Sequence, residues 1–206
     1  MADDVYLILH GWGGNKPAHW QEHLVGKLQE AGKTYYYPKM PEPTAPNLEA
    51  WQATLQQVLD TIGSEHPGAT VTVMAHSLGC INWIHFAARR GADAPKLAER
   101  VLLVAPPYVV KEAPPLDAPP GVTDFFPPPF QPETLKAIAN ETTLLASNTD
   151  DYATYDQSVG IAAKLDIPVQ LLDKGGHISP YYGYGEWPWV LAWALGEADF
   201  PPQPNS

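Results

Sequence analysis

The residue with the clearest chemical potential is Ser77, which lies in the segment Ala75-His-Ser-Leu-Gly79. A β-rich apolar run ends at Ala75, and a helix-like pattern begins directly after the serine. Small residues two positions before and after a serine are typical of a sharp strand-to-helix turn, because larger side chains would collide there. The helix N-terminus would place N–H groups beside a developing negative charge. The pattern therefore predicts an exposed, nucleophilic serine.

A serine hydroxyl is a weak nucleophile, so it needs a general base and an acid that orients the base. His177 is the only histidine after His85, and it follows a later strand-like run. Gly175 and Gly176 would let the backbone bend and direct the imidazole toward Ser77. Carboxylates at the ends of later strand-like runs are candidates for the acid, and the residues alone leave three open: Asp150, Asp151 and Asp173.

An oxyanion formed during attack by Ser77 would need at least two N–H donors. The N–H of Leu78 is the first expected donor, at the start of the helix. The second is the N–H of Trp12, in the glycine-rich turn His10-Gly-Trp-Gly-Gly14. A phosphate-binding loop is the competing interpretation of such a turn. It fails because the chain has neither the GxGxxG pattern nor a following Lys-Ser/Thr pair.

The elements that would position these residues are short apolar runs alternating with helix-like segments. Their near-continuous apolar character is typical of strands that are covered on both faces of a parallel sheet. The predicted strands are Val5–Leu9, Thr34–Tyr37, Thr70–Ala75, Arg100–Val104, Thr142–Ala146 and Pro168–Leu172. The predicted helices are Pro17–Ala31, Leu48–Ile62, Leu78–Arg90, Tyr155–Leu165 and Gly185–Leu195. This alternation predicts an α/β fold with a doubly wound sheet.

A proline-rich excursion, from Pro106 to Pro132, interrupts the alternation. It contains ten prolines in 27 residues, too many for a helix or an inner strand. We expect it to cover the carboxyl edge of the sheet, where ligands bind in such folds. Phe125, Phe126 and Phe130 would then line the substrate pocket.

Length and charge limit the function classes. A chain of 206 residues predicts one domain, residues 1–206. Its net charge of −11 argues against nucleic-acid binding and against an anchor on anionic membranes. A single cysteine, Cys80, excludes an intrachain disulfide and a multi-cysteine metal site. The acidic start of the chain lacks the basic region of a signal peptide, so we expect a cytoplasmic protein.

A zinc site is the main alternative to serine chemistry. His19, Glu22 and His23 match an inverted zinc-protease pattern, in which two histidines four residues apart share one helix face. A zinc ion also needs a third protein ligand, and no other segment presents a comparable cluster. We therefore expect no metal and no cofactor.

Five short motifs can be compared with known families: His10–Gly14, Ala75–Gly79, Asp150–Tyr152, Gly176–Ile178 and Gly185–Pro188. Together, these motifs resemble the α/β-hydrolase superfamily. More narrowly, they resemble the compact serine hydrolase family of retinoblastoma-binding protein nine and its bacterial relatives. The similarity extends from about Val5 to Leu195. The chain departs from the family at Ala75, where the family usually has Gly, and at Asp151, where it generally has Pro.

The resemblance implies a sheet of about six parallel strands in the order 2-1-3-4-5-6, with helices on both faces. It also implies a triad of Ser77, Asp150 and His177 that cleaves small carboxylic esters through an acyl-enzyme. The expected partner is thus a small-molecule ester. Because a fold does not determine a function, the alternative is a protein-binding module with little or no catalysis.

Overall fold

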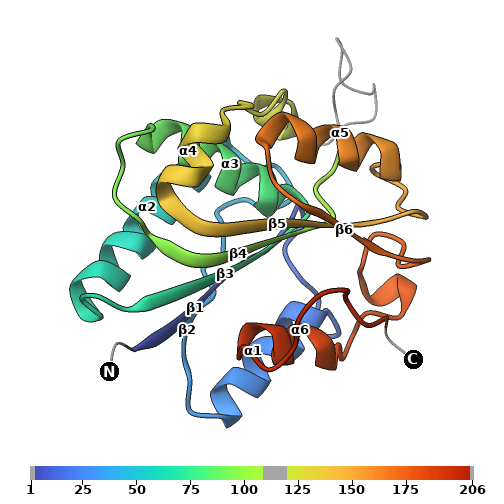
Figure 1. The fold of residues 1–206 in the computed structure, drawn as a ribbon, viewed down its shortest axis with the longest axis horizontal. Coiled ribbons are helices and arrows are strands. Elements are labelled where there is room, and N and C mark those ends of the chain that lie inside the picture. Colours follow the sequence, from blue (N-terminus) through green and yellow to red (C-terminus); the bar gives the residue numbers. More distant parts are fainter. Residues whose placement is uncertain (1–2, 109–119, 205–206) are drawn as a thin grey trace.

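A six-stranded parallel sheet forms the centre of the structure, a computed structural model that describes residues 3–108 and 120–204 (Figure 1). Its strand order is β2-β1-β3-β4-β5-β6, and all neighbouring strands are parallel. The strands are β1 Asp4–Leu9, β2 Thr34–Tyr36, β3 Thr70–His76, β4 Ala98–Val104, β5 Ala139–Ser147 and β6 Val169–Leu172. The predicted strands and their order are confirmed. The chain passes from β1 to β2 on one side and then crosses back to β3 on the other side of β1, so the strand order reverses between β1 and β3.

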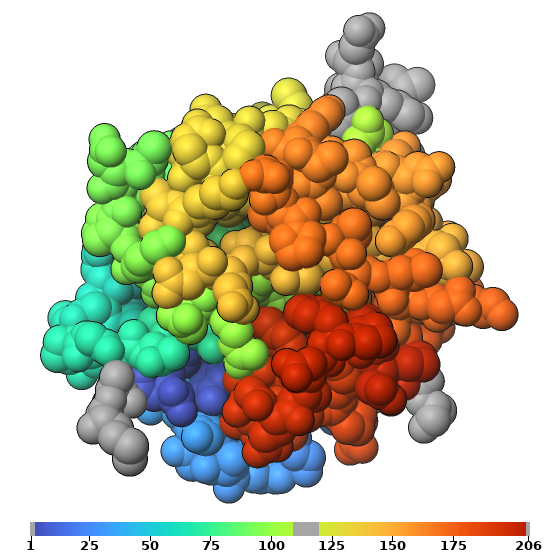
Figure 2. All heavy atoms as spheres, viewed as in Figure 1, coloured from blue at the N-terminus to red at the C-terminus, as the bar shows by residue number. Residues whose placement is uncertain are grey.

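Helices cover both faces of this sheet (Figure 1). The helices are α1 Trp20–Glu30, α2 Leu48–Glu65, α3 Leu78–Arg90, α4 Pro132–Ile138, α5 Tyr155–Leu165 and α6 Pro188–Ala194. Helices α1 and α6 pack on one face, and the other four pack on the opposite face. In the space-filling view the red C-terminal residues lie against the blue atoms of α1 (Figure 2). The two apolar clusters that result are those expected for strands buried on both sides.

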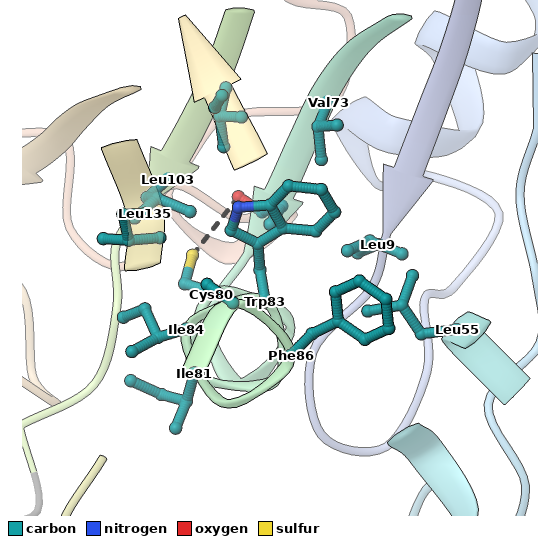
Figure 3. Close-up of a cluster of buried hydrophobic side chains, with 14 of the residues drawn as sticks. Leu9, Leu55, Val73, Cys80, Ile81, Trp83, Ile84, Phe86, Leu103 and Leu135 are labelled. Atoms are coloured by element: carbon teal, nitrogen blue, oxygen red, sulfur yellow. Dashed lines mark hydrogen bonds between the residues drawn. The ribbon is translucent and has the colours of Figure 1, made fainter. Parts of the chain in front are cut away.

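Helix α3, which follows Ser77, lies deep in the larger of these clusters. Figure 3 shows side chains radiating from it toward the sheet and the neighbouring helices. Trp83 and Ile81 are fully buried, and the thiol of Cys80 donates hydrogen bonds to the carbonyl oxygens of Ala75 and Val104. Burial raises the pKa of this thiol well above its ordinary value, so it stays protonated. The helix that carries the serine is therefore firmly anchored.

Two predicted helix starts need correction, and helix α2 runs to Glu65, three residues past its predicted end at Ile62. Helix α1 begins at Trp20 rather than at Pro17, because His19 is its N-cap: the His19 Nδ1 atom accepts a hydrogen bond from the Gln21 N–H at 3.2 Å. Histidine is an uncommon cap, whereas proline in a first turn is common, so the pattern favoured the earlier start. Helix α6 begins at Pro188, three residues after the predicted Gly185.

The proline-rich excursion contains more regular structure than its composition suggests. Residues 109–119 of it lie outside the described part of the chain. After them come a 3-10 turn, Val122–Phe125, and then helix α4, which was not predicted. Helix α4 starts at Pro132 in its first turn, where a missing N–H costs nothing. Among the described residues, no helix is long and apolar enough to cross a membrane.

Candidate active site

Ser77 occupies a sharp turn between β3 and α3. Its backbone has φ 52° and ψ −123°, a conformation that costs free energy for any residue other than glycine. The Ser77 N–H donates to the Val104 carbonyl oxygen at 2.9 Å, which ties the turn to the neighbouring strand. A Cβ atom at Gly79 would lie 2.7 Å from the His10 carbonyl oxygen, so α3 packs closely on β1 only because residue 79 is glycine. The strained turn holds the hydroxyl out at the carboxyl edge of the sheet.

A chain of hydrogen bonds links the serine to His177 and Asp150. The Ser77 hydroxyl lies 2.9 Å from His177 Nε2 and can donate to it. On the other side of the ring, His177 Nδ1 lies 3.0 Å from each carboxylate oxygen of Asp150. The Asp150 side chain is only 3% exposed and that of His177 is 11% exposed, so this contact is shielded from water. An Nδ1–H donated to the carboxylate leaves Nε2 free to accept the serine proton.

The structure distinguishes the three candidate acids. Asp150 faces His177, and its Oδ1 atom also accepts the Tyr152 N–H at 2.8 Å. The carboxylate of Asp151 instead accepts the hydroxyl of Tyr182. The carboxylate of Asp173 accepts the side-chain amide of Asn148 at 2.7 Å. Asp150 is therefore the acid that the fold brings to the histidine.

The loops that carry Asp150 and His177 are joined by further hydrogen bonds. The hydroxyl oxygen of Thr149 accepts the Gly176 N–H at 3.0 Å, and Asn148 Oδ1 accepts the Lys174 N–H at 2.8 Å. Gly176 has a φ of +55°, and a Cβ atom there would overlap the ring of Tyr182. These contacts fix the separation of the two loops, which sets the distance between acid and base.

Beneath His177 lies a group of buried histidines that the sequence did not identify as a unit. His76 Nε2 donates to the His177 carbonyl oxygen at 2.9 Å, and the His76 ring contacts that of His19 with centroids 4.8 Å apart. Burial lowers the pKa of His76 well below its ordinary value, and burial together with the charge of His177 lowers that of His19 to about 3. Both rings are therefore neutral. His76 is the last residue of β3 and directly precedes Ser77, and this position was the one signal in the sequence.

These lowered pKa values predict acid sensitivity. Because the folded pKa of His19 is about 3 and the unfolded pKa is about 6.5, the unfolded chain binds the proton first, and stability falls as the pH drops below about 6.5. At about pH 5 this single group is expected to cost about 2 kcal/mol of unfolding free energy. His19→Asn keeps a capping acceptor but cannot titrate.

Urea unfolding at about pH 7.5 and about pH 5 measures this effect. The His19→Asn variant should lose about 2 kcal/mol less than the wild type on acidification. An equal loss in both proteins would contradict the assignment of a buried, neutral His19.

The two expected oxyanion donors lie beside the serine. Within the described residues, neither the backbone N–H of Leu78 nor that of Trp12 donates a hydrogen bond to the protein, and both residues line the cavity at Ser77. The indole N–H of Trp12 is a separate group, and it donates to the Thr44 carbonyl oxygen at 3.1 Å. The loop of Trp12 is fixed by His10, whose Nδ1 donates to the Gly11 carbonyl oxygen at 2.8 Å and whose Nε2 accepts the Met40 N–H at 2.9 Å. The loop can therefore present a free N–H without reorganisation.

Gly11 makes the contact between this loop and the serine. A Cβ atom at Gly11 would lie 2.8 Å from the Ser77 Cβ, too close for either residue to keep its place. Gly11→Ala is expected to displace the nucleophile from the donors and to lower kcat on the order of 10²-fold. The matched control is Gly26→Ala in α1, where a Cβ meets nothing within 4 Å. Steady-state kinetics that show equal kcat values for both variants would contradict this contact.

A cavity of about 930 Å³ opens over Ser77, and aromatic side chains form much of its wall. Of the three expected phenylalanines, only Phe126 lines it. Phe125 is instead fully buried, with its ring centroid 5.3 Å from that of Trp51, and Phe130 packs beneath the ammonium group of Lys164. The predicted lining by Phe125 and Phe130 was wrong, because Phe125 is buried in the apolar core and the partly buried Phe130 packs against that core and Lys164.

The residues of the alternative zinc pattern have other partners. His19 Nδ1 caps α1, and the Glu22 carboxylate accepts the hydroxyl of Tyr37 at 2.9 Å. The ring of His23 lies 4.0 Å from the carboxylate of Glu186. In the described ranges, no group of three or more His, Cys, Asp or Glu residues is arranged to hold a metal ion.

The parallel sheet, the strained serine turn and the linked Ser-His-Asp side chains define an α/β-hydrolase fold of the serine hydrolase type. The family model described as "Serine hydrolase" matches residues 6–194, and the chain belongs to this family. It is 26% identical over 190 residues to "Putative hydrolase YdeN" of Bacillus subtilis, which covers 92% of this chain and 93% of that protein.

Solved structures show the same fold. The Bacillus subtilis ydeN product superposes with a TM-score of 0.76 at 24% identity, over 95% of this chain and 98% of that chain. Est1E of Butyrivibrio proteoclasticus superposes with a TM-score of 0.68 at 15% identity, over 95% of this chain and 86% of that chain. The assignment of this chain as a hydrolase rests on the family match and on the 26% identical relative, whereas the solved structures show the fold.

Proposed function

We propose that this hydrolase cleaves small carboxylic esters through a triad of Ser77, His177 and Asp150. The observation that carries the proposal is the continuous chain from the Ser77 hydroxyl through both ring nitrogens of His177 to the Asp150 carboxylate. Each link is within hydrogen-bond distance, and the order matches the roles of nucleophile, base and orienting acid. The free N–H groups of Leu78 and Trp12 add the donors that such a mechanism requires.

Acylation begins when the Ser77 oxygen attacks the ester carbonyl carbon and its proton passes to His177 Nε2. The carbonyl oxygen becomes an oxyanion, which accepts hydrogen bonds from the Leu78 and Trp12 N–H groups. The carbon–oxygen bond to the alcohol then breaks, and the leaving oxygen takes the proton from His177. The products of this step are the free alcohol and an acyl group on Ser77.

Deacylation uses the same groups, with water in place of the alcohol. A water molecule gives a proton to His177 and attacks the acyl carbon, and the oxyanion forms again between the same two donors. Collapse releases the carboxylic acid, and the proton on His177 returns to the Ser77 oxygen. Asp150 keeps its charge throughout and stabilises the protonated imidazole. One ester and one water therefore give one acid and one alcohol.

The direct test is acid-quenched turnover of p-nitrophenyl acetate. We expect release of p-nitrophenolate together with a peptide that carries an acetyl group on Ser77, detected by mass spectrometry. Release no faster than with free imidazole, and no acetylated peptide, would contradict the proposal. That result would favour the alternative, a binding module on a hydrolase fold.

A further inference from the structure

The cavity at Ser77 is ringed by unusually exposed aromatic side chains. Among the described residues, the large apolar side chains that remain exposed include Trp12 at 46%, Tyr152 at 58% and Tyr181 at 88%, and all three line this cavity. They come from three different loops at the carboxyl edge of the sheet, after β1, β5 and β6. Exposed rings gathered at one cavity indicate a binding surface.

The mechanism determines which part of an ester meets which ring. The leaving alcohol oxygen must receive its proton from His177 Nε2, so the alcohol part lies on the side of His177. The ring of Tyr152 is the nearest exposed ring on that side, with its centroid 4.4 Å from that of His177 and the two planes tilted by 50°. Trp12, in contrast, lies on the loop that carries the expected oxyanion donor.

Tyr152 is held in place by its backbone, while its ring is uncovered. Its N–H donates to Asp150 Oδ1 at 2.8 Å, and its carbonyl oxygen accepts the Tyr108 N–H at 3.0 Å. A ring fixed in this way can stack on a ligand without losing backbone freedom when the ligand binds. Offset or tilted stacking of two flat rings is favourable, whereas a saturated ring lacks the matching face.

The charges near Tyr152 limit the ligand further. Asp150 and Asp151 directly precede it in sequence, and both residues line the cavity. The one lysine or arginine among the described lining residues is Lys16, which follows the loop of Trp12. A negative group on the alcohol part would therefore be repelled by these carboxylates, above all by the exposed Asp151.

We propose that the cavity selects esters whose alcohol part carries an uncharged aromatic ring, stacked on Tyr152 beside His177. Benzyl-type esters are the simplest members of this class. This inference rests on the proposed ester hydrolysis and names the substrate class of that same site.

The test compares kcat/KM for acetate esters that share one acyl group. Benzyl acetate and cyclohexylmethyl acetate differ in the flatness of the ring, and 4-carboxybenzyl acetate adds a negative charge. We expect a preference of roughly two- to tenfold for benzyl over cyclohexylmethyl acetate, and a lower value for the charged ester. Tyr152→Phe should keep this preference, whereas Tyr152→Leu should bring the ratio close to one.

Methyl phenylacetate and methyl cyclohexylacetate form the second arm, because they carry the ring on the acyl side. Equal values for this pair would support the assignment of Tyr152 to the alcohol side. Equal values for the two ring acetates in the wild type, or a ratio unchanged in Tyr152→Leu, would overturn the inference while leaving ester hydrolysis intact. No Ser77-dependent cleavage of any of these esters would overturn the proposed function itself, and the inference with it.

Discussion

Ser77→Ala is expected to lower kcat for p-nitrophenyl acetate by at least about 10⁴-fold, because it removes the nucleophile. The fold should persist, since an alanine at this turn needs the same backbone conformation as the serine it replaces. Thermal unfolding therefore serves as the check that the variant is intact. Steady-state release of p-nitrophenolate measures the loss.

The matched control for this variant is Ser179→Ala, which removes another hydroxyl from the wall of the same cavity. It should keep most of the activity, because Ser179 lies outside the hydrogen-bonded chain of Ser77, His177 and Asp150. Substantial activity in Ser77→Ala, or an equal loss in both variants, would show that the serine is not the nucleophile.

Asp150→Asn is expected to lower kcat about 10⁴-fold at neutral pH, since an amide in place of the carboxylate favours the wrong tautomer of His177. Asp151→Asn and Asp173→Asn are the matched controls. Their carboxylates accept hydrogen bonds from Tyr182 and Asn148 instead of from His177. Both control variants should keep far more activity than Asp150→Asn.

The pattern of losses among the three acid variants decides the assignment. A loss in Asp151→Asn as large as that in Asp150→Asn would show that the hydrogen bond seen at His177 is not the one used in turnover. The comparison is sharp because all three substitutions replace one carboxylate by an amide of nearly the same size.

The positions of the strands and the place of the serine could be predicted from the sequence because both depend on local patterns, whereas the strand order followed from the family resemblance. Apolar runs predicted every strand, and the small residues around Ser77 predicted the strained turn now seen at φ 52°. The sequence also predicted that Ser77 and His177 would meet, because carboxyl ends of parallel strands share one edge. The roles of these residues in catalysis stay predictions.

Features that depend on contacts between distant segments could not be predicted in the same way. Three carboxylates had similar positions after strands, and only the course of the loops shows that Asp150 faces His177. Phe125 could be recognised as apolar, but its burial against Trp51 depends on how the excursion folds back on α2. His19 acts as a cap because its Nδ1 meets the Gln21 N–H, a use that its residue type rarely indicates.

The most direct measurement of the central claim is labelling of the folded protein with a fluorophosphonate, followed by digestion and mass spectrometry. If His177 and Asp150 activate the Ser77 hydroxyl, the adduct forms on the peptide that contains Ser77. The same peptide should stay largely unlabelled in urea and in His177→Ala. A Ser77 peptide that remains unmodified in the folded wild-type protein would contradict the account.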